Sequence, residues 1–174
     1  MATQEEVNAL TLRAIRKRMT EVFPDQIITC MQSLTDEQLW WRPNENSNSV
    51  GTLVLHVSGA LNHYVAHRIG GTAYVRDRPR EFTERNLSVE QLQQIFREAV
   101  AGCERTLADL EPERMLEPST EPEFYTVLLE DLIGALVHMT VHTGQIVYLT
   151  KMLSPGSGKE LWRTSHLVHG LWKK

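Results

Sequence analysis

Four long amphipathic segments constrain the fold of this chain more than any other feature. Apolar residues recur at steps of three and four over about 4–34, 49–69, 88–110 and 125–153, which is the spacing of one apolar face on an α-helix. No segment shows the two-residue alternation that is typical of a strand. Helices of this kind bury their apolar faces against one another, so the sequence predicts an all-α four-helix bundle over residues 1–153.

The ends and connections of these helices are also marked. The spacing of a capping box occurs at 35–38 and at 88–91, where each pattern predicts the start of a helix. Pro24 interrupts the first apolar pattern and either kinks one long helix or begins a second piece, and the sequence leaves both open. The connections at about 35–48 and 70–87 are long, which permits crossovers in place of a simple up-and-down order.

Two further segments fall outside these helices. The loop at 111–124 holds three prolines and many acidic residues, and we expect it to lie outside the core. The tail at 154–174 begins with Ser-Pro-Gly but carries two tryptophans and several aliphatic residues. Because so much apolar surface is unfavourable in water, the tail is predicted to pack on the bundle or on a partner subunit.

Composition limits the classes of function. The net charge of −4 does not favour a nucleic-acid partner, which usually needs a basic face. No apolar run approaches about 18 residues and no signal-peptide layout opens the chain, so we expect a cytoplasmic protein without a membrane segment. Cys30 and Cys103 lack the close spacing of a redox or zinc pair and are expected to be buried free thiols.

The most informative chemical feature is the pair His138 and His142. Residues four apart lie on the same helix face, and this face is otherwise mostly apolar, so both imidazoles should point inward. Two such imidazoles can bind one metal ion. A third from a neighbouring helix would complete a site with open coordination positions, which is typical of a reactive metal. The alternative is a pair of core histidines hydrogen-bonded to backbone or carboxylate groups.

Spacing alone does not identify the third ligand. His56, His63 and His67 share one stripe of the second predicted helix, and the last two are themselves four residues apart. Apolar neighbours surround His56 in the sequence, which favours it on burial. His63 approaches the polar end of the helix, where a place in the pocket or a solvated role is open to it.

Other polar residues have less specific patterns. Gln145 lies about one turn past His142 and could bond a metal-bound water or orient a ligand histidine. Asp131 could act as a carboxylate behind a ligand, or complement the dipole at the helix start. The charged run at 76–81 is interpreted as a solvated loop, with an anion clamp involving Arg78 as the alternative.

Three sequence motifs together resemble the DinB superfamily over about residues 10–153. They are Trp-Trp-Arg-Pro at 40–43, VGTLVLHVSGAL at 50–61, and LVHMTVHTGQIVYL at 136–149. The resemblance implies a metal triad of His56, His138 and His142, which decides the ambiguity in favour of His56. It also implies a four-helix bundle with long crossover connections, a nickel or zinc ion, and a homodimer.

The resemblance further implies a reaction class, because characterised relatives include thiol-dependent S-transferases and a thiol-dependent isomerase. We therefore expect an enzyme that transfers a low-molecular-weight thiol to a small electrophile, or a hydrolase that activates metal-bound water. The alternative is a non-catalytic protein, either a metal-stabilised bundle or a stress protein that binds a small ligand. The sequence contains no P-loop, Rossmann or nucleophile-elbow motif.

Overall fold

The computed structural model describes residues 2–156, and these residues are predominantly helical, with no β-strand. The elements in chain order are α1 (Gln4–Lys17), a π-helical segment η1 (Arg18–Val22), α2 (Phe23–Gln32), α3 (Asp36–Trp40), α4 (Val50–Ala60), a second π-helical segment η2 (Leu61–His67), α5 (Arg78–Thr83), α6 (Val89–Asp109), a 3₁₀ turn η3 (Pro112–Leu116) and α7 (Leu128–Leu153). The predicted all-α fold is confirmed.

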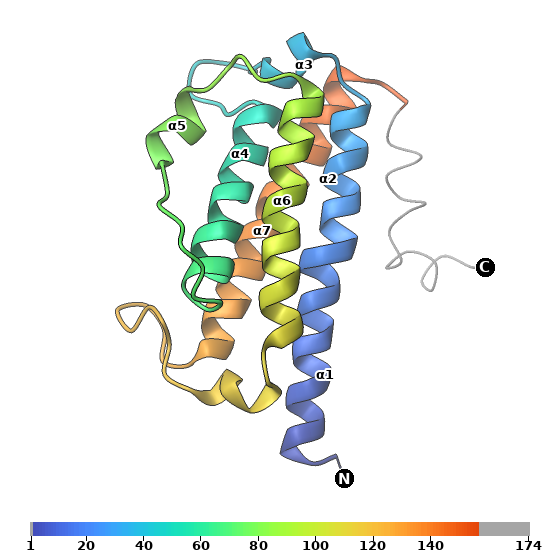
Figure 1. The fold of residues 1–174 in the computed structure, drawn as a ribbon. Coiled ribbons are helices and arrows are strands. Elements are labelled where there is room, and N and C mark those ends of the chain that lie inside the picture. Colours follow the sequence, from blue (N-terminus) through green and yellow to red (C-terminus); the bar gives the residue numbers. More distant parts are fainter. Residues whose placement is uncertain (1, 157–174) are drawn as a thin grey trace, which may run out of the picture.

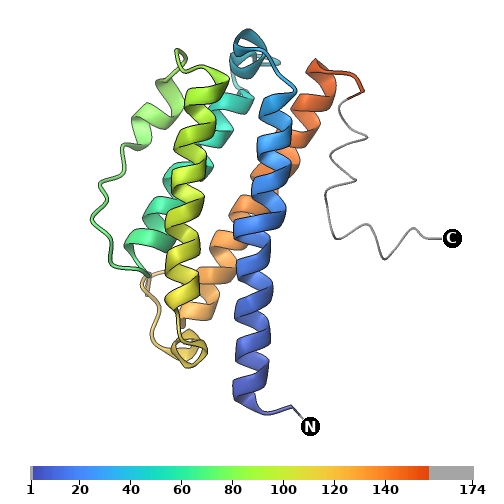
Figure 2. The same ribbon diagram turned by 45° about the vertical axis from the view of Figure 1, so that its right-hand side comes forward.

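The bundle consists of four rods, namely α1 with α2, α4 with η2, α6, and α7 (Figure 1). Figure 1 shows α1 and α2 running up, α4 and α6 both running down, and α7 running up again. Figure 2 shows the same rods from a second direction, with α6 alongside α2. Since α4 and α6 run in the same direction, the connection between them must return along the length of the bundle. This connection is therefore a crossover, and it carries α5.

Helix α4 lies at the centre of the packing, against α5, α6 and α7. Every residue of α4 except Leu55 is buried. Small residues make this possible, because a Cβ added to Gly51 would lie 2.6 Å from the Trp40 ring. A helix that is buried all round places its side chains with little freedom, and His56 is one of them.

Pro24 lies in the first turn of α2, where a missing N–H is tolerated, and the rod continues through the π-helical segment before it. The loop at 111–124 was expected to lie outside the core, which is wrong for Met115, since this residue is fully buried. The 3₁₀ turn η3 packs against α1 and α7 and brings that side chain inward.

Among the described residues, α7 is the one helix that is long and apolar enough to cross a membrane by length and composition. A bundle helix passes the same test, and α7 packs against α2, α4 and η2. It nevertheless exposes apolar side chains along one face, each between 45% and 67% accessible. These residues, called the α7 stripe below, are Ile133, Val137, Val141, Tyr148 and Met152.

Most of the predicted tail, from residue 157 onward, lies outside the described residues. Its docking on the bundle or on a partner stays a prediction.

Candidate metal centre

Three histidines from two helices converge at the centre of the bundle. His56 comes from α4, and His138 and His142 come from successive turns of α7. The Nε2 atom of His138 lies 2.9 Å from Nε2 of His56 and 3.2 Å from Nε2 of His142. One nitrogen from each ring lies within 4.8 Å of the other two, so the three residues could hold a metal ion. The structure thus brings together the three residues that the sequence singled out.

The outer nitrogens of two of these rings have hydrogen-bond acceptors. His56 Nδ1 lies 2.8 Å from Glu81 Oε2, and His142 Nδ1 lies 2.7 Å from Gln145 Oε1. A carboxylate or amide oxygen accepts, so each Nδ1 carries the proton and each Nε2 is left with a free lone pair. The lone pairs of His56 Nε2 and His142 Nε2 both face Nε2 of His138, so a cation among the three nitrogens would be stabilised by all of them. The donor set therefore fits a metal ion.

The electrostatic environment keeps the two histidine rings of α7 neutral. Burial lowers the pKa of His138 to about 4, and the nearby rings of His142 and His56 and the guanidinium groups of Arg76 and Arg78 act in the same direction. Burial also lowers the pKa of His142, against the opposing effect of its hydrogen bond to Gln145. Neutral imidazole is the form that binds a metal, so the ring nitrogens of His138 and His142 are available at neutral pH.

A buried ion pair between Arg76 and Glu81 contacts the outer nitrogen of His56. Glu81, on α5, is only 6% exposed. Its carboxylate receives two hydrogen bonds from Arg76, at 2.6 Å and 2.9 Å, in addition to the one from His56. Burial of Glu81 tends to raise its pKa, but the hydrogen bonds from His56 and Arg76 lower it overall, so the carboxylate is charged. A Cβ at Gly59 would lie 2.0 Å from Glu81 Oε1, so only glycine leaves room for this carboxylate.

The interpretation of residues 76–81 as a solvated loop is therefore wrong for Arg76 and Glu81. Both side chains are less than 10% exposed. Local sequence does not reveal this, because Glu81 meets His56 across 25 residues of chain. Glu81 and His56 meet because the crossover connection passes back over α4. The sequence signal closest to it is Gly59, whose missing side chain makes the space.

The remaining candidate residues lie around the triad. Asp131 bonds to Ser119 Oγ and to the Thr120 backbone N–H and not to a ligand histidine, so it fastens the loop before α7. His63 contacts the rings of Tyr64 and His67 and is not part of the triad.

Arg78 is exposed, and Phe82 is the ring that both Arg78 and His56 contact. Its guanidinium lies 5.9 Å from the centre of the Phe82 ring, and that ring lies 5.2 Å from the ring of His56. The anion contact proposed for Arg78 stays a prediction.

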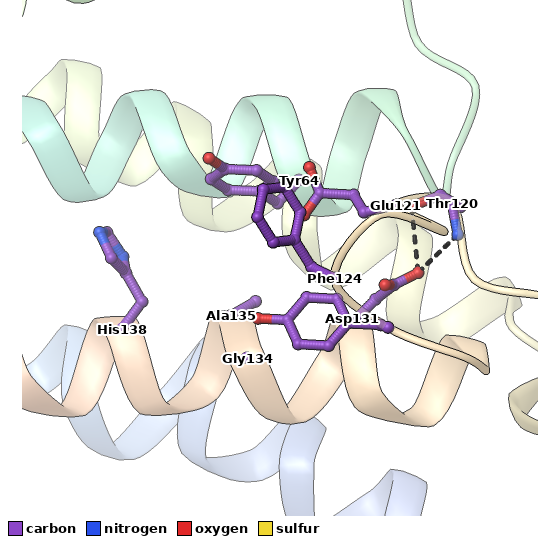
Figure 3. Close-up of a pocket in the computed structure, with 9 residues that line it drawn as sticks. Tyr64, Thr120, Glu121, Phe124, Asp131, Gly134, Ala135 and His138 are labelled. Atoms are coloured by element: carbon purple, nitrogen blue, oxygen red, sulfur yellow. Dashed lines mark hydrogen bonds between the residues drawn. The ribbon is translucent and has the colours of Figure 1, made fainter.

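A cavity of about 260 Å³ borders His138, and Figure 3 shows it between α7, η2 and the loop before α7. A second cavity, of about 330 Å³, is lined by Gln145 and by part of the loop at 43–48. The first cavity therefore contacts the triad at His138, whereas the second contacts Gln145, which bonds to His142.

Fold and site together define an all-helical bundle protein with a candidate three-histidine metal centre. A family model described as "Protein of unknown function (DUF1572)" matches residues 6–165. The chain belongs to this DUF1572 family. No curated protein matches the chain.

Proposed function

We propose that this protein is a divalent-metal-dependent enzyme of the DinB type that transfers a low-molecular-weight thiol to a small electrophile. The observation that carries the proposal is the convergence of three Nε2 atoms, two of them on rings whose Nδ1 protons are held by Glu81 and Gln145. The DinB-like motifs around His56 and around His138 and His142 support it. We also propose a cytoplasmic location.

The triad would hold a nickel or zinc ion. Three neutral imidazoles would leave the charge of such an ion uncompensated, so the ion would lower the pKa of a bound thiol or water toward neutrality. Glu81 and Gln145 keep the protons of His56 and His142 on Nδ1 and so fix the direction of both rings. In the transfer, the thiol would lose its proton to solvent water, its sulfur would bond to the electrophilic carbon, and the displaced group would leave with the bonding electron pair.

The contacts of Glu81 favour a thiol over water as the nucleophile. This carboxylate bonds directly to a ring of the triad, and it is fully engaged by Arg76 and His56. It is therefore not free to act as a general base. A thiol, with an ordinary pKa of about 8.5, needs less help to ionise than water does. Hydrolysis by metal-bound water is the alternative reaction proposed for the same site.

Metal analysis of protein purified without a nickel column tests the proposal, followed by assays with several thiols and a chloronitrobenzene electrophile. We expect about one divalent ion per chain and consumption of the electrophile that depends on both thiol and metal. Bound metal without any thiol-dependent or hydrolytic reaction would instead favour a non-catalytic metal-stabilised bundle. Protein without bound metal, and unable to take it up, would contradict the proposal.

We further propose that the protein forms a homodimer through the α7 stripe. Five half-exposed apolar side chains along one helix face make the kind of surface that a second subunit covers. The resemblance to the DinB superfamily supports the same assembly.

Val137→Glu is expected to convert this dimer into a monomer in sedimentation velocity, because association would bury an unpaired carboxylate. Val137 is 54% exposed, so the change should leave the fold of each chain intact. Val75→Glu adds the same charge at a position that is 94% exposed and off the stripe, and it should remain dimeric. A parent protein that sediments as a monomer, or a Val137→Glu variant that stays dimeric, would contradict the proposed interface.

A further inference from the structure

We infer that the cavity beside His138 binds the uncharged aromatic part of the electrophilic substrate. The inference rests on the proposed function, since it assigns a substrate class to the same site. It is carried by the position of the cavity, by its aromatic lining, and by the pairing of its charged groups.

The cavity opens directly onto the candidate metal centre. In Figure 3, His138 stands at one end of it, and the rings of Tyr64 and Phe124 lie further along. Tyr64 comes from η2, Phe124 from the loop before α7, and Ala135 from α7 itself. A group lodged between these rings therefore has its reacting end next to the triad.

The two carboxylates that line the cavity are already paired. Glu121 forms an ion pair with Arg68, and Asp131 accepts hydrogen bonds from Ser119 and Thr120. Arg68 neutralises Glu121, hydrogen bonds occupy the oxygens of Asp131, and the residues that line the cavity include no lysine or arginine to pair with an anionic ligand. The cavity therefore suits an uncharged group.

The aromatic lining is already positioned for a ligand. Phe124 is 74% exposed, although its backbone N–H bonds to the Glu121 carbonyl at 2.9 Å and holds it in a turn. Tyr125 bonds to the same carbonyl, and its ring rests on α7, so that a Cβ at Gly134 would lie 2.4 Å from its hydroxyl oxygen. Because the turn already fixes the backbone of Phe124, binding a ligand against its ring costs little backbone entropy. A flat aromatic group can stack on that ring.

The cavity beside Gln145 has a different character. Asn46, Ser47, Asn48 and Gln145 contribute to its lining. These polar side chains suit a hydrophilic thiol cosubstrate better than an aromatic group. Of the two cavities, the one with the aromatic lining is the one that a triad histidine also lines, which assigns the aromatic group to the side of His138.

The test uses full-length protein loaded with Co²⁺, titrated with phenylmethanethiol and, separately, with ethanethiol. Binding of either thiol to the ion is followed by its sulfur-to-cobalt absorption band. The ring of phenylmethanethiol stands for the aromatic part of the substrate. Phe124→Ala should weaken phenylmethanethiol about fivefold, because the exposed ring is lost. It should leave ethanethiol unchanged. Leu116→Ala, which removes another exposed apolar side chain from the same connection, should change neither.

A second pair of variants tests the shape of the cavity. Gly134→Ala should lift the Tyr125 ring off α7 and into the cavity, so that phenylmethanethiol binds several-fold more weakly. Gly144→Ala makes the same change elsewhere on α7, where nothing lies within 4 Å of the added Cβ, and should have no effect on either thiol. A change in metal binding would affect both thiols equally, so the ratio of their affinities reports on the cavity alone.

The outcomes separate the two proposals. If both thiols bind but no variant changes their ratio, the proposed function stands and the aromatic subsite is overturned. If no cobalt or thiol binds, the proposed function fails. The cavity is then tested without metal by ligand-observed NMR with 4-methylphenol. Binding in the parent that is weakened in Phe124→Ala supports the subsite, and no binding, or equal binding in both, overturns it.

Discussion

Replacing His142 by alanine is expected to abolish metal binding and any thiol-dependent activity while leaving a folded bundle. Only two of the three converging nitrogens would remain, which is too few to hold the ion at ordinary concentrations. His142 is the most suitable of the three residues for this test. It is partly exposed, and its outer nitrogen bonds only to Gln145, so its loss should cost little packing.

The measurements are metal content, activity and the melting curve of the variant. His67→Ala is the control, since this histidine lies outside the triad and bonds to the Thr72 carbonyl. If the ion is catalytic, the melting temperature of His142→Ala should resemble that of the metal-free parent and remain high, because apolar burial supplies most of the stability. A variant that lost its metal and melted far earlier, with no activity found in the parent, would refute the enzyme reading, because the metal would then supply folding free energy.

The second large effect is expected from Glu81→Gln. Metal affinity should fall by roughly 10- to 100-fold, since the carboxylate that orients the His56 ring is lost. The free energy of unfolding should fall by about 3–5 kcal/mol, because the guanidinium of Arg76 would remain buried without a countercharge. Isothermal titration with Zn²⁺ and urea unfolding of the metal-free protein measure the two effects separately.

A double variant distinguishes a positioning role from a merely structural one. Arg76→Met combined with Glu81→Gln removes both buried charges and should recover much of the stability, while metal affinity stays low. Glu104→Gln is the matched control, because Glu104 pairs with Arg16 at a site where both side chains are more than a third exposed. It should change stability by less than about 1 kcal/mol and leave metal affinity unchanged. Full metal affinity in Glu81→Gln would contradict the positioning role.

Much of the fold was predictable from local sequence. Helix α6 begins with the expected capping box, in which Ser88 accepts from the Gln91 N–H and Gln91 bonds back to Ser88. The end of the second rod at Gly71, whose φ is +71°, is equally local. The burial of Met115 was missed because proline and acid content describe a loop but not the surface on which it lies.

The candidate site was also predictable from the sequence only in part. The placement of His138 and His142 together follows from helical spacing alone. The choice of His56 over His63 depended on a family resemblance. Arg76 and Glu81 were misread because a charged run far along the chain has no periodic relation to the helix it covers. Such contacts depend on the direction of a crossover, which in turn depends on how the whole bundle packs.

This protein can change its substrate more easily than its metal site, because the two depend on different parts of the fold. The residues proposed to hold the ion stand on α4 and α7, whereas Arg78, Phe124 and Tyr125 stand on the segments that join the rods. Apart from Arg76 and Glu81, which support His56, changes in those segments alter what reaches the centre without changing the residues proposed to hold the ion. A library confined to residues 77–80 and 117–126 would therefore search for new substrates while the ion stays in place.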